Sequence, residues 1–242
     1  MMSASGRYLP LLLVLFALSG CSALIYEIVW FQMLQLIIGS SAVSIGVLLG
    51  TFMGGMCLGS IALRRIISGK MHPLRVYALL ELGIGVIGIA VLFFIPYVDN
   101  LYIASIGYGL AGIIFRGAVC ALCLLPSTLL MGATLPLIAR WVEITPRGVS
   151  WLGFLYGGNT AGAVFGTLLA SFYLLRVYDI AIATYVAAAF NWTVAFIGIT
   201  LAFITPYRVT ASDSSESPVV HAHGTRVVYV TIGAVWSCRN GC

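Results

Sequence analysis

The sequence predicts an all-α membrane protein, a polytopic bundle of about six transmembrane helices. Hydrophobic residues make up 61% of the 242 residues and charged residues only 8%, whereas soluble domains carry roughly 25% charged residues. The mean hydropathy is +1.09, and the apolar residues gather in runs long enough to cross a bilayer. The composition therefore fits lipid rather than water as the solvent.

The charge balance is a signal of membrane topology. The chain has 12 Lys and Arg against 7 Asp and Glu, a net charge of +5, and most of these residues stand between apolar runs. Basic residues near the ends of spans mark the cytoplasmic side. Because aromatic residues are not interleaved with a basic patch, we expect no nucleic-acid partner. We expect a bacterial-type inner (plasma) membrane, with the N-terminus in the cytoplasm and the lipid bilayer as the main partner.

The six cysteines do not predict a disulfide framework, because four of them lie within apolar runs. Cys120 and Cys123 form a C-x-x-C pair, which suggests metal or redox chemistry in soluble proteins. Here neither a histidine nor a second cysteine pair stands beside them. We therefore expect no metal, no cofactor and no catalytic residue in this chain.

The first span is predicted from residue 8 to about residue 30, and the residues up to Ile38 are expected to extend it along the interface. A competing interpretation is a bacterial lipoprotein signal, because Leu18 to Cys21 resembles a lipoprotein cleavage box. A lipoprotein would continue into a polar tether, but this chain continues into the apolar run Ala23 to Phe31. We favour the span, with Arg7 on the cytoplasmic side.

The second span is predicted over Val43 to Ile67, and its glycines recur about every four residues. Such spacing forms a groove on a helix that lets a neighbouring span approach closely. The glycines expected to pack in this way are Gly46, Gly50, Gly54, Gly55 and Gly59. The densest cluster of basic residues follows, and it predicts a cytoplasmic loop that includes Arg64, Arg65, Lys70 and Arg75.

The third span is predicted over Val76 to Tyr97, followed by Asp99 and Asn100 on the opposite face of the membrane. The apolar stretch Leu101 to Ile138 exceeds the roughly 20 residues that one crossing needs. We expect an interfacial segment that ends near Arg116 and then a fourth span over Gly117 to Ile138. Two full spans are the alternative.

The last two spans are predicted over Trp151 to Leu175 and over Ala181 to Tyr207. Gly158, Gly162 and Gly166 repeat the four-residue spacing and are expected to pack against another helix. The chain then divides into a helical module of residues 1–208, a polar linker of residues 209–225 and residues 226–242, which start a further apolar segment that ends abruptly.

Polar residues within the apolar runs are the candidate functional residues, because an ionisable group in hydrocarbon is costly. Glu27 in the first span could bind a substrate or a proton, or could act as an ion pair or interfacial anchor. Glu81 in the third span could line a substrate or ion path, or could pair with Arg64, Arg65 or Arg75 of the loop. Arg116 could extend to the outer headgroups. Asn159 and Thr160 could line a path or join two spans.

Five stretches of the chain resemble membrane proteins described as fused major facilitator and spermidine synthase-like. The stretches are Leu18 to Trp30, Phe52 to Gly55 with Leu58 to Ser60, Tyr77 to Gly85, Leu130 to Leu137, and Tyr156 with Asn159 to Gly166. The resemblance covers nearly all of residues 8 to 206. It implies a helical bundle like half of a major facilitator fold, which in longer relatives precedes more spans or an aminopropyltransferase-like domain.

The resemblance implies a transporter-like module for a small metabolite, such as a polyamine, with a path along Glu27, Glu81, Asn159, Thr160 and Arg116. One alternative is a membrane anchor or scaffold for an aminopropyltransferase-like domain, with no transport. Another is a truncated fragment without function. Because half a major facilitator fold normally works with its other half, we expect a homo-oligomer or an aminopropyltransferase-like partner. The chain lacks a nucleotide loop and an acidic cluster, so transferase activity does not carry over.

Overall fold

A computed structural model describes residues 8–66, 71–103, 110–142 and 148–205. They belong to the first of two compact units, Met1–Tyr207, while the second unit, Arg208–Cys242, lies outside the described residues. The predicted linker and the last apolar segment therefore lie outside them as well. The secondary structure of the described residues is helical throughout, which confirms the predicted all-α class.

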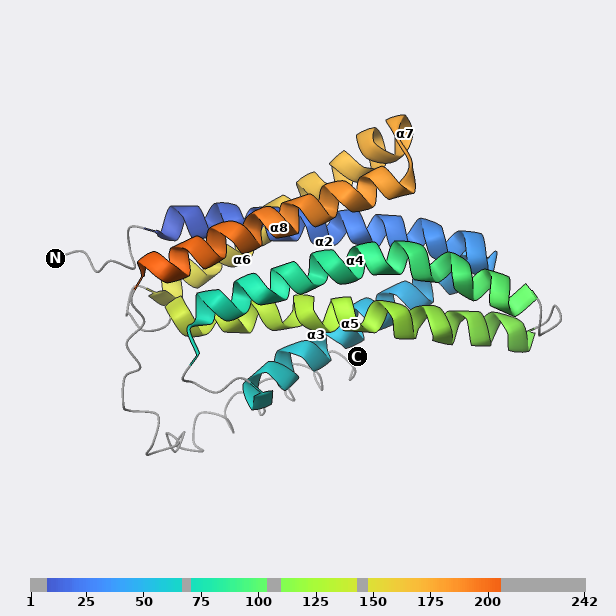
Figure 1. Cartoon of the computed structure of the whole chain (residues 1–242), viewed down its shortest axis with the longest axis horizontal. Coiled ribbons are helices and arrows are strands. Elements are labelled where there is room, and N and C mark those ends of the chain that lie inside the picture. The colour runs from blue at the N-terminus through green and yellow to red at the C-terminus, as the bar shows by residue number, and fades with distance from the viewer. Residues whose placement is uncertain (1–7, 67–70, 104–109, 143–147, 206–242) are drawn as a thin grey trace, which may run out of the picture. The chain divides into compact units, whose positions relative to one another are not determined.

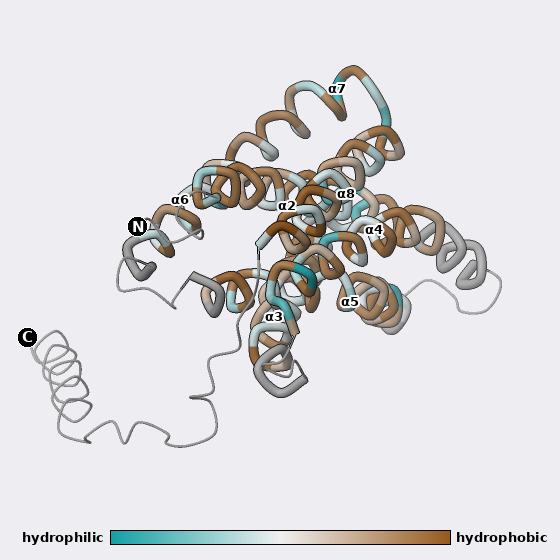
Figure 2. Tube along the Cα trace, turned by 60° about the vertical axis from the view of Figure 1, so that its left-hand side comes forward, coloured by the Kyte–Doolittle hydropathy of each residue, from teal (hydrophilic) through white to brown (hydrophobic). Residues whose placement is uncertain are grey.

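Six long helices make up the described part of the chain, and all six are apolar and long enough to cross a membrane. Figure 2 shows hydrophobic residues along most of their length. Their bounds are α2 Leu9–Ile38, α3 Ser41–Ile66, α4 Pro73–Ile103, α5 Leu110–Val142, α6 Gly148–Leu169 and α8 Ile180–Ile204. The prediction of about six spans in a helical membrane bundle is confirmed.

Helix α2 is one continuous helix, which corrects the prediction of a span ending near residue 30 with an interfacial extension. Pro10 stands in the first turn, where its missing N–H costs nothing. Gly39 ends the helix with φ 74°, and its N–H donates to the carbonyl of Gln35. The apolar run up to Ile38 therefore continues the same helix into the core, where Ile37 and Ile38 are buried.

The stretch Leu101 to Ile138 crosses the bundle once. Residues 110–116, which were predicted to end an interfacial segment, belong to the crossing helix, while residues 104–109 lie outside the described residues. Helix α4 continues through Pro96 to Ile103, and α5 begins already at Leu110, before Arg116. Pro126 and Pro136 stand within α5 without ending it. In spans, hydrogen bonds from neighbouring groups can satisfy the backbone that a proline leaves free. Hydropathy alone could not fix where the fourth span begins, because the apolar stretch is longer than one crossing needs.

Helix α6 ends in a short π-helix, Ala170–Leu174, followed by the single turn α7, Leu175–Val177. The carboxylate of Asp179 then caps α8 by accepting a hydrogen bond of 2.8 Å from the N–H of Ile182. This turn separates the last two predicted spans.

Two apolar clusters show that consecutive helices run in opposite directions. One cluster joins the beginnings of α2 and α4 to the ends of α5 and α8, with Leu9, Leu74, Ile138 and Leu201 as members. The other cluster contains Ile38 at the end of α2 together with residues near the beginnings of α3, α5 and α8. With six helices alternating in this way, residues 8 and 205 lie at the same end of the bundle.

The helices pack chiefly in three pairs, α2 with α6, α3 with α5, and α4 with α8. Helix α4 lies between α8 and α5, as Figure 1 shows. Helix α2 contacts α6, α8 and α3. The candidate spans α2, α4 and α8 are more buried inside the bundle than α3, α5 and α6. Side chains from α2 therefore reach several neighbours at once.

Candidate functional site

A cavity of about 490 Å³ lies between α2, α3, α5 and α6. Its size falls within the range of small-molecule pockets, roughly 300 to 1,000 Å³. Most of the wall is apolar, with Phe16, Phe52, Met56 and Met131 among the lining side chains. The cavity lies among four candidate spans, so its wall belongs to the membrane-embedded part of the bundle.

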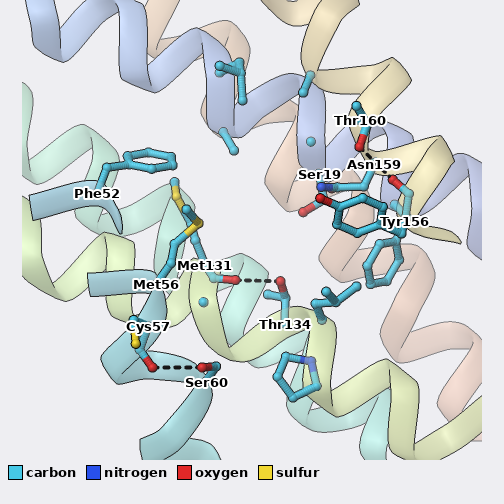
Figure 3. A pocket seen from close by; sticks show the side chains of 18 residues that line it. Ser19, Phe52, Met56, Cys57, Ser60, Met131, Thr134, Tyr156, Asn159 and Thr160 are labelled. Carbon is cyan, nitrogen blue, oxygen red and sulfur yellow. Dashed lines mark hydrogen bonds between the residues drawn. The ribbon is translucent and has the colours of Figure 1, made fainter. Parts of the chain in front are cut away.

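The polar part of the wall comes mainly from α2 and α6. Figure 3 shows Ser19, Tyr156, Asn159 and Thr160 together on one side of the cavity, opposite Phe52 and the two methionines. The hydroxyl of Thr160 donates to the carbonyl of Tyr156 at 3.0 Å within its own helix. Within the described part of the chain, the half-buried amide of Asn159 has no hydrogen-bond partner. That amide is therefore available to a bound solute.

The helices α2 and α6 approach so closely because glycines and small residues face each other. A Cβ at Gly20 would overlap the backbone carbonyl of Asn159, and a Cβ at Gly162 would overlap the carbonyl of Ala17. A Cβ at Gly166 would likewise overlap the carbonyl of Cys21, whereas one at Gly158 would meet the end of the Leu13 side chain. These contacts fix Ser19 and Asn159 next to each other at the cavity.

The second-span glycines divide into two sets. Gly55 and Gly59 lie against Thr128 and Leu129 of α5, where a Cβ would overlap described atoms. Gly46, Gly50 and Gly54 meet no described atom within 4 Å of an ideal Cβ. For these three the predicted close packing is not observed within the described bundle, because they lie on a different side of α3 from Gly55 and Gly59.

Glu81 lies behind the cavity wall, fully buried in α4. Its Oε1 accepts a hydrogen bond of 2.6 Å from the hydroxyl of Ser19, which itself lines the cavity. Tyr77, one helical turn earlier, brings its buried hydroxyl next to the same carboxyl. Neither that hydroxyl nor Oε2 of Glu81 completes a hydrogen bond with a described residue.

The predicted pairing of Glu81 with a loop arginine is not observed for Arg75, whose guanidinium lies 5.1 Å from the centroid of the Phe203 ring. The side chains of Arg64 and Arg65 and the whole of Lys70 lie outside the described residues. The cytoplasmic loop thus stays a prediction. His72, which directly precedes α4, contacts the carbonyl of Thr205 at 2.9 Å. This contact joins the beginning of α4 to the end of α8.

Glu27 and Arg116 do not line the cavity. Glu27 is half-buried well inside α2 rather than near a span end, and the structure gives it no hydrogen-bond partner among the described residues. Arg116 donates through Nη1 to the carbonyl of Ile37 at 2.7 Å, in the last turn of α2. The expected reach of Arg116 to headgroups is therefore replaced by a hydrogen bond within the bundle.

Sequence reasoning missed the roles of Ser19, Ser22 and Asn191. The hydroxyl of Ser22 contacts Oδ1 of Asn191, which is fully buried in α8, and also donates to the carbonyl of Ser19 at 2.8 Å. Ser19 stood out in the sequence only within the apparent lipoprotein box. The sequence signal that could have found them is a polar residue within an apolar run. That signal does not distinguish them from several serines and threonines whose side chains bond only to their own helix.

Comparison with known proteins gave no match: no family model, no curated protein and no solved structure is significantly similar to this chain. We therefore infer the chemistry of the site from its own residues alone.

Proposed function

We propose that this chain is a transporter-like membrane module that binds a small solute in the cavity between α2, α3, α5 and α6. The observation that carries the proposal is the cavity itself, with a free amide and hydroxyl groups converging inside a bundle of candidate spans. Polar groups are costly in hydrocarbon, and in membrane proteins they mark solute pathways. A purely anchoring bundle has no need of a polar cavity wall.

The wall favours an uncharged solute that forms hydrogen bonds. None of the residues lining the cavity is Asp, Glu, Lys, Arg or His. A polyamine would enter with several positive charges and would find no carboxylate on the wall, which is unfavourable at low dielectric constant. Asn159, Tyr156 and Ser19 instead offer an amide and two hydroxyl groups beside aromatic and aliphatic surface.

We further infer that the module is the N-terminal part of a protein of the fused major facilitator and spermidine synthase-like family. The stretches on which that resemblance rests supply all the residues that line the cavity except Phe16, Met56 and Cys57. The stretch Tyr77 to Gly85 supplies Glu81, which hydrogen-bonds to Ser19 on the wall. Sequencing the gene beyond codon 242 tests this inference. A frame encoding further spans or an aminopropyltransferase-like domain supports it, and unrelated sequence contradicts it.

Uptake into proteoliposomes tests the solute site. We would measure tritiated adenosine and glucose as uncharged probes and tritiated spermidine as the charged probe. We expect uptake of an uncharged probe above that of protein-free vesicles, and a decrease of about tenfold or more in Asn159→Ala, because a hydrogen bond to the solute contributes roughly 1 kcal/mol and a lost partner more. If Asn159→Ala folds poorly, Tyr156→Phe replaces it as the test variant, because it removes only one hydroxyl of an exposed residue.

Thr193→Ala is the matched control, because Thr193 is exposed on α8, bonds only to the carbonyl of Ala189 at 2.7 Å and lies outside the cavity. Its uptake should equal that of the wild type. If none of the three probes enters faster than into protein-free vesicles, the proposal fails and the anchoring alternative gains support. If spermidine alone enters, the inference of an uncharged solute is wrong.

A further inference from the structure

Glu81 is an acid buried inside the bundle without a described positive charge beside it. Its side chain has 0% exposure, and it is the single acidic residue within the candidate span Pro73–Phe94. Ser19 donates to the carboxyl at 2.6 Å and the Tyr77 hydroxyl lies beside it, while Oε2 completes no hydrogen bond with a described residue. A carboxylate held this way is poorly stabilised, since a buried charge needs a partner or several hydrogen bonds.

The titratable groups on the surrounding helices do not supply that partner. From α4 itself, the phenol of Tyr77 lies beside the carboxyl, and from α2 the phenol of Tyr26 is near enough to interact with it electrostatically. From α5, the described basic side chain is Arg116, which contacts Ile37 near the far end of α2, about 27 Å along that helix from Ser19. From α8, the described titratable side chain is the exposed Tyr185.

The basic groups near the beginning of α4 are also directed elsewhere. Arg75 lies over the ring of Phe203, and His72 contacts the carbonyl of Thr205. No described cation is thus within reach of Glu81. The site also has too few oxygen atoms to replace the hydration shell of a metal cation, which takes six or more oxygen ligands. A proton is the cation that this site can hold, since it needs one oxygen atom.

We propose that Glu81 is a proton-binding site that exchanges protons with the cavity through the hydroxyl of Ser19. A hydronium ion in the cavity gives a proton to Oγ of Ser19, while the original Ser19 O–H bond breaks and its proton binds Oε1 of Glu81. One O–H bond forms on Glu81, one breaks on the hydronium ion, and Ser19 ends with the single proton that it had. The route requires only contacts that the structure contains.

Protonation then changes what Ser19 offers to a solute. When Glu81 is ionised, the Ser19 hydroxyl donates to it, as observed, and only the lone pairs of Oγ remain for the cavity. When Glu81 is protonated, its own O–H can donate to Oγ of Ser19, and the Ser19 proton is free to point into the cavity. The cavity wall thereby gains a donor, so a solute with a hydrogen-bond acceptor binds better to the protonated form.

This consequence for solutes rests on the proposed function, whereas the proton site does not. Infrared difference spectroscopy of the purified full chain in nanodiscs, recorded without solute while the pH is raised from acidic to alkaline, tests the proton site directly. We expect the carbonyl band of a protonated carboxyl group to lose intensity as the pH rises. The loss of intensity should be smaller in Glu81→Gln than in the wild type by the contribution of one carboxyl group, and that contribution should be retained in Glu27→Gln, the control acid outside the cavity wall.

Ser19→Ala keeps the carboxyl group and provides a second measurement if Glu81→Gln does not fold. We expect its band to move to higher wavenumber, because the protonated carboxyl group loses the hydrogen bond between its O–H and Oγ of Ser19. A titrating carboxyl band that is the same in the wild type and in Glu81→Gln overturns the proposal. A band that is unmoved by Ser19→Ala overturns the route through Ser19.

Uptake with an inward proton gradient tests the link to the solute. We expect the gradient to stimulate uptake of the transported probe about fivefold or more in the wild type and not at all in Glu81→Gln. A titrating Glu81 band in a protein that takes up no probe supports the proton site and contradicts the proposed function. Uptake that is insensitive to pH, in a protein whose titrating carboxyl band is the same in Glu81→Gln, supports the function and overturns the proton site.

Discussion

The hydroxyl of Ser19 on α2 donates a hydrogen bond of 2.6 Å to Oε1 of Glu81 on α4. The two residues are 62 positions apart in sequence, and their contact joins the cavity wall to the most deeply buried acid of the described chain. One side chain thereby connects the proposed solute site with the proposed proton site.

Ser19→Ala is expected to lower the free energy of unfolding by about 1 to 3 kcal/mol, the cost of leaving a buried polar group without its partner. Unfolding by increasing mole fractions of a denaturing detergent in mixed micelles measures this change. Ser60→Ala is the matched control, because the Ser60 hydroxyl bonds to the carbonyl of Cys57 in its own helix at 2.8 Å. Equal stability of the two variants would contradict a structural role for the Ser19 contact.

Gly162→Ala is expected to destabilise the bundle by about 1 to 3 kcal/mol, the usual cost of overpacking a tight contact. The new Cβ would overlap the backbone carbonyl of Ala17, which cannot move away like the end of a side chain. Thermal unfolding monitored by circular dichroism measures the change.

Gly50→Ala is the control for that prediction, because open space surrounds the position of its Cβ. Alanine favours a helix over glycine by about 1 kcal/mol, so this variant should unfold at the same temperature as the wild type or higher. A loss of stability in Gly50→Ala comparable to that in Gly162→Ala would show that the glycines outside the described contacts are also packed.

Cys57 is expected to react with a small water-soluble maleimide in the folded protein, whereas Cys21 and Cys120 react only after denaturation. Cys57 is exposed and lines the cavity, while the other two are buried. The experiment uses a background in which Cys238 and Cys242 are replaced by serine, and mass spectrometry of peptides identifies the labelled thiol. Labelling of Cys21 at the rate of Cys57 would show that the α2–α6 contact opens readily.

Arg116→Gln is expected to destabilise the protein by about 1.5 to 3 kcal/mol, because a hydrogen bond from a charged group is lost at the end of α2. Arg176→Gln serves as the comparison, since Arg176 is exposed in the turn after the π-helix and should change stability by no more than about 0.5 kcal/mol. The same detergent titration measures both. If both variants unfold at the same detergent mole fraction as the wild type, Arg116 extends to lipid headgroups, as the sequence had suggested.

The sequence by itself determined the number and approximate position of the spans. Hydropathy is a local property, and a run of apolar residues such as Val76 to Tyr97 needs lipid or a core whatever its neighbours are. It also indicated Glu81, Asn159 and Thr160 as polar residues within spans, and two of these line the observed cavity. It could not fix where the fourth span begins within Leu101 to Ile138, because this apolar stretch is longer than one crossing needs.

The tertiary structure alone decided which groups meet. The rotation of each helix about its axis is set by packing against neighbours, so Gly54 lies open while the adjacent Gly55 contacts Thr128. For the same reason Glu81 meets Ser19 and not the nearby Arg75, and Asn191 meets Ser22 from the other end of the chain. Such contacts depend on the relative positions of helices distant in sequence, on which a local hydropathy pattern carries no information.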